Sequence, residues 1–105
     1  MIKVSALINL LKKNESNFYT GVTDSVLKEL SSSLQKTSKK NHIIATNEGA
    51  AVSIGIGHYL STKKIPVIYM QNSGLSNALN PLISIAHHKV YSIPLILIVG
   101  WRGSP

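Results

Sequence analysis

The sequence predicts an α/β fold, with a doubly wound, mostly parallel sheet of about four strands flanked by helices. The main observation is a set of apolar runs over residues 42–46, 65–70 and 94–99. The second and third runs are apolar at nearly every position, which is typical of parallel strands covered on both faces. Helical patterns separate the runs, and this alternation of strands and helices indicates a parallel α/β sheet.

The first half of the chain is expected to form helix, strand and helix. Apolar residues recur at helical spacing over residues 4–13, and residues 18–20 are a short β-prone run ending at Gly21. Asp24 or Thr23 can cap the next helix. The apolar positions of that helix are Val26, Leu27, Leu30 and Leu34.

The second half is expected to contain three strands and two helices. We expect strands over residues 42–46, 65–70 and 94–99, and helices over residues 47–60 and 75–88. The small residues of the first of these helices are Gly49, Ala50, Ala51, Gly55 and Gly57. Each glycine disfavours an isolated helix by about 1 kcal/mol. The cluster therefore favours a buried helix that another backbone approaches closely, although ordinary packing against a sheet explains it equally well.

The composition indicates one small domain over residues 1–105. Its 44% hydrophobic content is typical of a packed globular chain. No apolar run reaches the roughly 18 residues of a membrane span. The chain has no cysteine, so disulfides and thiolate chemistry are excluded, and we expect a cytoplasmic protein that contacts no membrane.

The chain is basic, with a net charge of +7. Its densest positive patch is residues 36–40, in a polar linker, and such a patch can bind nucleic acid or anionic substrates. No aromatic side chains interleave with these lysines as a base-stacking surface requires. A solvated loop explains the patch better, and we do not expect nucleic acid as a partner.

A functional site in such a sheet is expected beyond the carboxyl ends of the strands. Four segments meet this condition: residues 20–24, Asn47-Glu48, residues 71–74 and Trp101-Arg102. Glu48 is the main candidate because it lies between an apolar run and a helix of small residues. Buried carboxylates are rare without a partner or a task, and we expect Glu48 to be such a carboxylate.

Other polar residues have weaker claims. Asp24 is either a second acid or a helix cap. Adjacent helical residues point about 100° apart, so His87 and His88 would rarely bind one metal ion. His42 and His58 are expected to be ordinary surface or core histidines. The sequence contains no metal-ligand spacing, P-loop or nucleophile elbow.

The segment over residues 71–78 has a more specific pattern. Side-chain amides and hydroxyls gather at an expected helix N-terminus, which can bind an anion or a heteroaromatic ring. A cap formed by Asn72 or Ser73 would account for one or two of these residues. It would leave Gln71 and Asn77 unexplained.

Three stretches together resemble a known family. They are TNEGAAVSIGIGHYL, IPVIYMQNSGLSNALNPL and VYSIPLILIVGWRG. They are similar to the pyrimidine-binding (PYR) domain of thiamine-diphosphate-dependent decarboxylases, most of all to the phosphonopyruvate decarboxylases and then to sulfopyruvate decarboxylase alpha subunits. YTGVTDSVLKEL is similar to the first substrate-side loop of that family, so the resemblance covers nearly the whole chain.

The resemblance implies roles for individual residues. The glutamate at the position of Glu48 hydrogen-bonds N1′ of the cofactor aminopyrimidine and so promotes loss of the thiazolium C2 proton. The segment Gln71, Asn72, Ser73 and Gly74 would line the pyrimidine, with Asn77 close behind. Gly21 and Asp24 would lie on the substrate side, and Arg102 is our candidate for the anionic end of the substrate.

The resemblance also implies that another domain is needed. The family's metal- and diphosphate-binding motif, a GDG followed by asparagines, is absent from these 105 residues. Thiamine diphosphate would then be held here by its pyrimidine end only, and Mg²⁺ by a separate diphosphate-binding (PP) domain. We expect a homo- or hetero-oligomer that acts as a carbon–carbon lyase on a 2-oxo acid when the PP partner is present. The alternatives are a catalytically incomplete PYR domain serving as an assembly module, and a basic polyanion-binding domain.

Overall fold

The apolar runs of the sequence form a four-stranded sheet in the computed structural model, which describes residues 3–86, 89 and 91–101. All of the strand pairs are parallel, in the order β2-β1-β3-β4. The strands are β1 (Tyr19–Gly21), β2 (His42–Ile44), β3 (Val67–Gln71) and β4 (Ile96–Gly100). The predicted α/β class and strand number are therefore confirmed.

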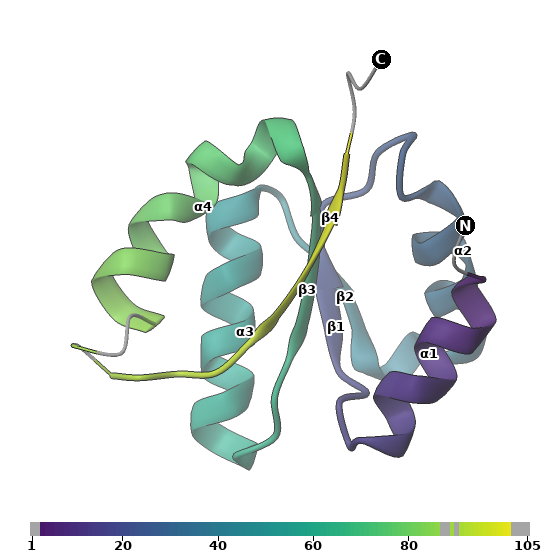
Figure 1. Cartoon of the computed structure of the whole chain (residues 1–105), viewed down its shortest axis with the longest axis horizontal. Coiled ribbons are helices and arrows are strands. Elements are labelled where there is room, and N and C mark those ends of the chain that lie inside the picture. The colour runs from purple at the N-terminus through teal and green to yellow at the C-terminus, as the bar shows by residue number, and fades with distance from the viewer. Residues whose placement is uncertain (1–2, 87–88, 90, 102–105) are drawn as a thin grey trace.

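Helices cover both faces of the sheet (Figure 1). The helices α1 (Val4–Lys13) and α2 (Lys28–Thr37) lie on one face, and α3 (Glu48–Thr62) and α4 (Leu75–Pro81) lie on the other. The 3₁₀ segments are η1 (Lys39–Asn41) and η2 (Asn72–Gly74), and a π-type turn, η3 (Leu82–Ala86), follows α4. Among the described residues, no helix is long and apolar enough to cross a membrane.

The central strand β3 separates two hydrophobic clusters. Val67 and Tyr69 face α1 and α2, whereas Ile68 and Met70 face α3 and α4. All four side chains are fully buried. Burial on both faces explains why this strand is apolar from Val67 to Met70 instead of alternating.

Most of the predicted elements are present, and two helices differ from their predicted bounds. The second helix begins at Lys28, after Val26 and Leu27, because Asp24 holds those two residues in a separate turn. The helix predicted to reach His88 ends as an α-helix at Pro81, which lacks the N–H of a regular turn. The π-type turn follows, and His87 and His88 lie outside the described residues.

The glycines of α3 have three different environments. Gly49 is approached by backbone, because a β-carbon there would lie 3.0 Å from the carbonyl oxygen of Asn77. Gly55 makes room for the side chain of Ile68. Gly57 has no neighbouring atom within 4 Å of such a carbon. The prediction that another backbone approaches this helix closely is therefore confirmed at Gly49, at the start of the helix. It is wrong at Gly57.

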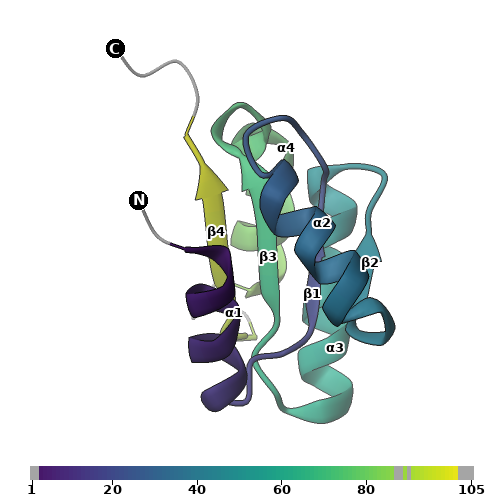
Figure 2. The same cartoon turned by 90° about the vertical axis from the view of Figure 1, so that its right-hand side faces the viewer.

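The sheet changes its winding direction between β1 and β3, which are neighbours. The chain leaves β1 toward α2 on one face and leaves β3 toward α4 on the other (Figure 2). In doubly wound sheets the crevice beyond such a switch point is the usual binding position. The segments that follow these two strands are two of the four in which the sequence analysis placed candidates.

Candidate functional site

Glu48 is the first residue of α3, directly after the short connection from β2. Asn47 is the N-cap: its backbone is extended, and its side-chain oxygen accepts a hydrogen bond from the Ala50 N–H at 2.8 Å. The cap fixes the start of the helix. It therefore places the Glu48 carboxylate at a helix N-terminus, where a negative charge is favoured.

The Glu48 carboxylate contacts the segment that follows β3. Asn77 Nδ2 donates a hydrogen bond to Glu48 Oε1 at 3.1 Å. Gly74 lies directly against the same side chain, since a β-carbon there would be 2.6 Å from Glu48 Cδ. Only glycine at position 74 leaves this carboxylate where it is. Glu48, Gly74 and Asn77, here called the Glu48 corner, therefore lie in contact with one another.

Glu48 is partly exposed, which corrects the expectation of a buried carboxylate. The apolar residues of α3 that face the sheet, Ala51, Val52 and Ile56, begin one turn further along. The first helical turn lies beyond the carboxyl edge of the sheet. The local sequence is apolar, but its apolar side chains lie below the carboxylate instead of around it.

The polar segment after β3 does not act as a helix cap. Gly74 is the N-cap residue of α4, and no side chain caps this helix. Ser73 instead accepts a hydrogen bond through Oγ from Gln71 Nε2 at 2.8 Å. Asn72 lies between them in η2. The capping explanation of Asn72 and Ser73 is therefore wrong for α4, and these polar side chains need another explanation.

The substrate-side candidates lie at the same edge, after β1. Gly21 is buried, and a β-carbon there would be 2.5 Å from Cγ of Tyr69. Asp24 Oδ1 accepts hydrogen bonds from the N–H groups of Val26 and Leu27 at 2.7 and 2.9 Å. Asp24 therefore caps a turn that precedes α2, and the expectation that it caps the helix itself is wrong, because no side chain among the described residues caps α2. Arg102 lies outside the described residues.

His42 is a core histidine, which agrees with the expectation of a surface or core histidine, but the sequence analysis missed its contacts. His42 is 6% exposed, its Nδ1 lies 2.8 Å from Gln35 Oε1, and its Nε2 lies 2.6 Å from the Tyr69 hydroxyl. Burial lowers the pKa of His42. These residues meet only through sheet register and helix packing, so no local motif could have revealed them.

The other described histidine, His58, stacks on Phe18 with ring centroids 4.1 Å apart. Burial, and then the charge of Lys64, lower the pKa of His58. Within residues 3–86, 89 and 91–101, no group of three or more acidic, histidine or cysteine side chains could hold a metal ion.

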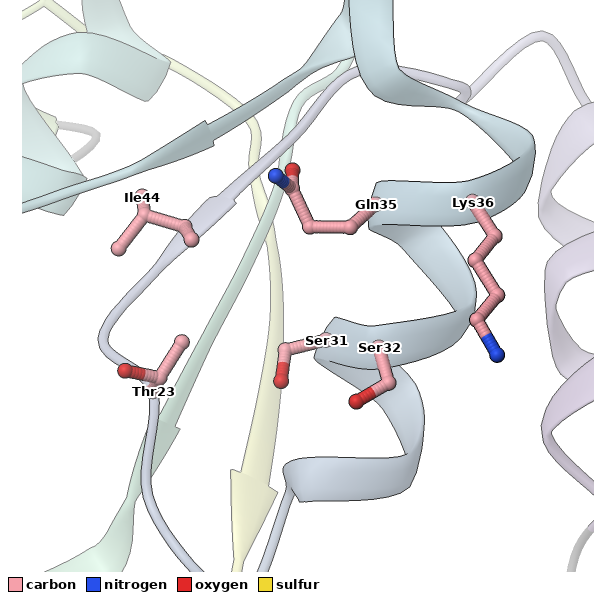
Figure 3. Close-up of a pocket in the computed structure, with 6 residues that line it drawn as sticks. All are labelled: Thr23, Ser31, Ser32, Gln35, Lys36 and Ile44. Carbon is pink, nitrogen blue, oxygen red and sulfur yellow. The ribbon is translucent and has the colours of Figure 1, made fainter.

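A cavity of about 280 Å³ lies between α2 and β2 (Figure 3). Its lining residues are Thr23, Ser31, Ser32, Gln35, Lys36 and Ile44. Glu48 is not among them. The Glu48 corner is a set of side chains on the carboxyl edge of the sheet, and this cavity is a separate feature on the α2 face.

Residues 3–105 match a family model described as "Thiamine pyrophosphate enzyme, N-terminal TPP binding domain". The chain belongs to this family. The match covers nearly the whole chain, including every element of the sheet. The family resemblance in the sequence is thereby confirmed, and the fold is that of a TPP binding domain.

Curated relatives of this TPP binding domain are decarboxylases. The sulfopyruvate decarboxylase subunit alpha of Methanocaldococcus jannaschii is 36% identical over 98 residues, which is 93% of this chain and 56% of the relative. The phosphonopyruvate decarboxylase of Streptomyces viridochromogenes is 34% identical over 85 residues, which is 81% of this chain and 21% of the relative. The chain thus spans about half of one relative and a fifth of the other.

A solved structure shows the same fold. It is a protein from Mycobacterium smegmatis named as a thiamin diphosphate-dependent enzyme, and it matches with a TM-score of 0.75 at 20% identity. The match covers 95% of this chain and 19% of the solved chain. The TPP binding domain described here therefore has the architecture of one part of a much longer protein.

Proposed function

We propose that this chain is the PYR half of a thiamine-diphosphate-dependent 2-oxo acid decarboxylase, in which Glu48 contacts the cofactor aminopyrimidine. The observation that carries the proposal is the Glu48 corner. A carboxylate stands at a capped helix N-terminus, one of its oxygens is held by Asn77, and Gly74 leaves room for it. Family membership and the decarboxylase relatives support the same function.

The residues at this corner fit an aminopyrimidine ring. A partly exposed carboxylate can exchange a hydrogen-bonding proton with a ring nitrogen, while Asn77 fixes the other oxygen. Gln71 and Ser73, already bonded to each other, present amide and hydroxyl groups beside it. The absent β-carbon of Gly74 leaves the carboxylate against the backbone at the start of α4.

Thiamine diphosphate, when bound, supplies the electron sink that decarboxylation of a 2-oxo acid requires. The chain's own contribution is to hold and move a proton at Glu48. Asn77 orients the carboxylate, and residues 71–74 bind the ring edge. Gly21, at the end of β1, and Asp24, on the loop that follows, face the substrate, and Arg102 binds its anionic group.

The other half of the site comes from a PP domain, which supplies Mg²⁺ and the diphosphate site. The relatives named as alpha subunits support a partner of this kind. Leu79 and Ile83, on the segment that carries Asn77, are each 54% exposed. An apolar surface next to the Glu48 corner is suited to contact with a second domain.

The proposal is tested by reconstitution. The chain is mixed with the PP-domain subunit of a sulfopyruvate decarboxylase, Mg²⁺ and thiamine diphosphate, and carbon dioxide release is measured from sulfopyruvate and from 3-phosphonopyruvate. We expect turnover of at least one substrate. Replacing the proton-transfer group in Glu48→Gln should lower kcat about 10²- to 10⁴-fold.

Glu29→Gln is the matched control, because Glu29 is an exposed carboxylate in the first turn of a different helix, α2. It removes the same charge and should leave turnover unchanged. Full activity of Glu48→Gln would refute the role of Glu48. If the chain forms a stable complex with the PP subunit and the complex turns over neither substrate, the assembly-module function would be favoured instead.

A further inference from the structure

A hydrogen-bond chain that joins an exposed glutamine to a buried histidine and a buried tyrosine crosses the sheet on its α2 face. It runs from Gln35 on α2, through His42 on β2, to Tyr69 on β3, with distances of 2.8 and 2.6 Å. Tyr69 is fully buried and His42 nearly so. Figure 3 shows Gln35 extending from α2 toward the strands. We call these three residues the Tyr69 corner.

The direction of each hydrogen bond in this chain follows from the Gln35 side-chain oxygen, which faces His42 Nδ1. Gln35 Oε1 can only accept, so His42 Nδ1 carries the ring proton and donates it. The other ring nitrogen, Nε2, then accepts from the Tyr69 hydroxyl. Both nitrogens of a neutral His42 are satisfied, and the Tyr69 hydroxyl has one defined orientation.

Tyr69 reaches His42 by passing over β1. The strand β1 lies between β2 and β3, and Gly21 pairs with Tyr69 in the sheet register. A β-carbon at Gly21 would lie 2.5 and 2.6 Å from Cγ and Cδ1 of the Tyr69 ring. The ring therefore occupies the space that a side chain on β1 would fill. The backbone oxygen of Tyr69 also accepts the N–H of Val22 at 3.3 Å.

Asp24, which ends the loop over residues 21–24, is also close enough to influence the pKa of Tyr69. Burial, and then the negative charge of Asp24, raise the pKa of Tyr69 to about 12. Tyr69 therefore remains a protonated donor to His42 at neutral pH. Asp24 is itself fixed by its two hydrogen bonds from Val26 and Leu27.

We propose that Tyr69 is a positioning residue that holds the loop over residues 21–24, and that Gln35 and His42 fix Tyr69 in the required orientation. Tyr69 contacts this loop by ring packing at Gly21 and by a backbone hydrogen bond at Val22. The hydrogen bond from the Tyr69 hydroxyl to His42 keeps the tyrosine ring over β1. The position of the loop therefore depends on this buried contact. The proposal depends on the proposed function only in calling this loop substrate-facing.

Tyr19 provides a matched control. It is also a buried tyrosine, 1% exposed, on the same face of the sheet, but its hydroxyl has no hydrogen-bond partner among the residues that the structure describes. Tyr19→Phe therefore removes a hydroxyl without removing a hydrogen bond, whereas Tyr69→Phe also removes the bond to His42. The two variants separate positioning from the general loss of a buried hydroxyl.

The first experiment is NMR spectroscopy of the chain alone. In the wild type, imidazole ¹⁵N shifts should show His42 with its proton on Nδ1. In Tyr69→Phe we expect changed His42 ring shifts and displaced amide signals of residues 21–24, with neither change in Tyr19→Phe. Unmoved loop amides in Tyr69→Phe, or equal displacement in both variants, would overturn the proposal.

Gln35→Met keeps the test decisive if Tyr69→Phe does not fold. Gln35 is an exposed residue of α2, so its replacement should be tolerated. Without the acceptor at Nδ1, His42 should populate both neutral tautomers, and the loop amides should shift in the same direction as in Tyr69→Phe. Retention of a single His42 tautomer with unmoved loop amides would refute the proposed chain.

The second experiment uses the complex with the PP subunit. Tyr69→Phe should raise KM about threefold to tenfold, the range that one hydrogen bond supplies, with a smaller change in kcat. Equal losses in Tyr19→Phe would count against positioning. The NMR result does not depend on turnover, so failure of the proposed decarboxylase would be recognised separately from failure of this proposal.

Discussion

The Tyr69 corner and the Glu48 corner, the two polar corners of the sheet, are built in opposite ways. In the Tyr69 corner, Tyr69 and His42 are buried, and both nitrogens of the histidine ring are paired within the chain. In the Glu48 corner, Glu48 is partly exposed and Asn77 exposed, and the bond between them is 3.1 Å long. Both corners depend on a glycine whose missing β-carbon makes room for a neighbouring side chain.

The difference separates structural support from a surface available for binding. A buried polar network is stable only when each member has its partner, and the Tyr69 corner meets that condition without any other molecule. The Glu48 corner keeps polar atoms accessible at the edge of the sheet. The chain thus places its accessible carboxylate on one face and the network that holds the neighbouring loop on the other.

The largest effect is expected from Gly21→Ala. The new β-carbon would overlap the Tyr69 ring and crowd the backbone oxygen of Tyr69. Forcing an extra carbon into a packed interior typically costs about 1–3 kcal/mol. Urea unfolding should show a loss of this size in the free energy of unfolding, together with changed His42 ring signals.

The control for this variant is Gly57→Ala on α3, where no atom lies within 4 Å of the new carbon. This substitution removes a helix-interior glycine and should stabilise the chain by about 0.5–1 kcal/mol. If Gly21→Ala were as stable as the wild type, the Tyr69 ring would not lie against β1 in solution.

The second prediction concerns the pH dependence of stability. Burial lowers the pKa of His42 below its ordinary 6.5, so the unfolded chain binds the proton more tightly than the folded chain. This stability is present above about pH 6.5 and is lost as the pH falls through the lowered pKa. The urea concentration at the unfolding midpoint should therefore decrease when the pH is lowered from about 7.5 to about 5.5.

His58→Asn isolates the contribution of His42, because burial and Lys64 lower the pKa of His58 in the same direction. The urea midpoint of this variant should still depend on pH, and this dependence should become weaker when His42→Asn is added. A urea midpoint that stays constant over the whole range in the wild type would contradict a buried neutral His42.

The sequence predicted the fold well because the fold depends on patterns that are local. The unalternating apolar run of β3 and the helical spacing of α1 each lie within one element. Helix ends were less predictable: α2 begins late because the Asp24 turn intervenes, and α4 ends early at Pro81. In the first case the hydrogen bonds that Asp24 accepts, and in the second the missing N–H of Pro81, end a helix that the apolar pattern alone would extend.

The candidate site was predictable only in part, and mostly through the family resemblance. That resemblance placed Glu48, Gly74 and Asn77 together, although Gly74 is 26 residues and Asn77 is 29 residues after Glu48 in the sequence. The exposure of Glu48 could not be read from its apolar neighbours, because α3 directs those side chains inward below it. The contact between His42 and Tyr69 depends on Gly21, and no spacing rule relates these three positions.

A smaller effect on stability is expected from Gly74→Ala. The three atoms nearest the new β-carbon all belong to the Glu48 side chain, which can turn away toward solvent. The free energy of unfolding should change by less than about 1 kcal/mol, because a flexible partly exposed chain yields where a packed ring does not. The side-chain amide signals of Asn77 should nevertheless shift as the carboxylate leaves. Unchanged Asn77 signals would show that Glu48 does not occupy this position.

The smallest effect is expected in the coupling between Glu48 and Asn77. A double-mutant cycle of Glu48→Ala and Asn77→Ala, measured by urea unfolding, should give about 0.5–1 kcal/mol, since water competes for this exposed bond. The equivalent cycle of His42→Ala and Tyr69→Phe should give about 1–3 kcal/mol, because breaking that bond leaves a buried nitrogen unpaired. A larger coupling at Glu48 than at His42 would reverse the assignment of the two corners. The accessible carboxylate would then be part of the chain's structural framework, and the buried histidine would be the more replaceable of the two.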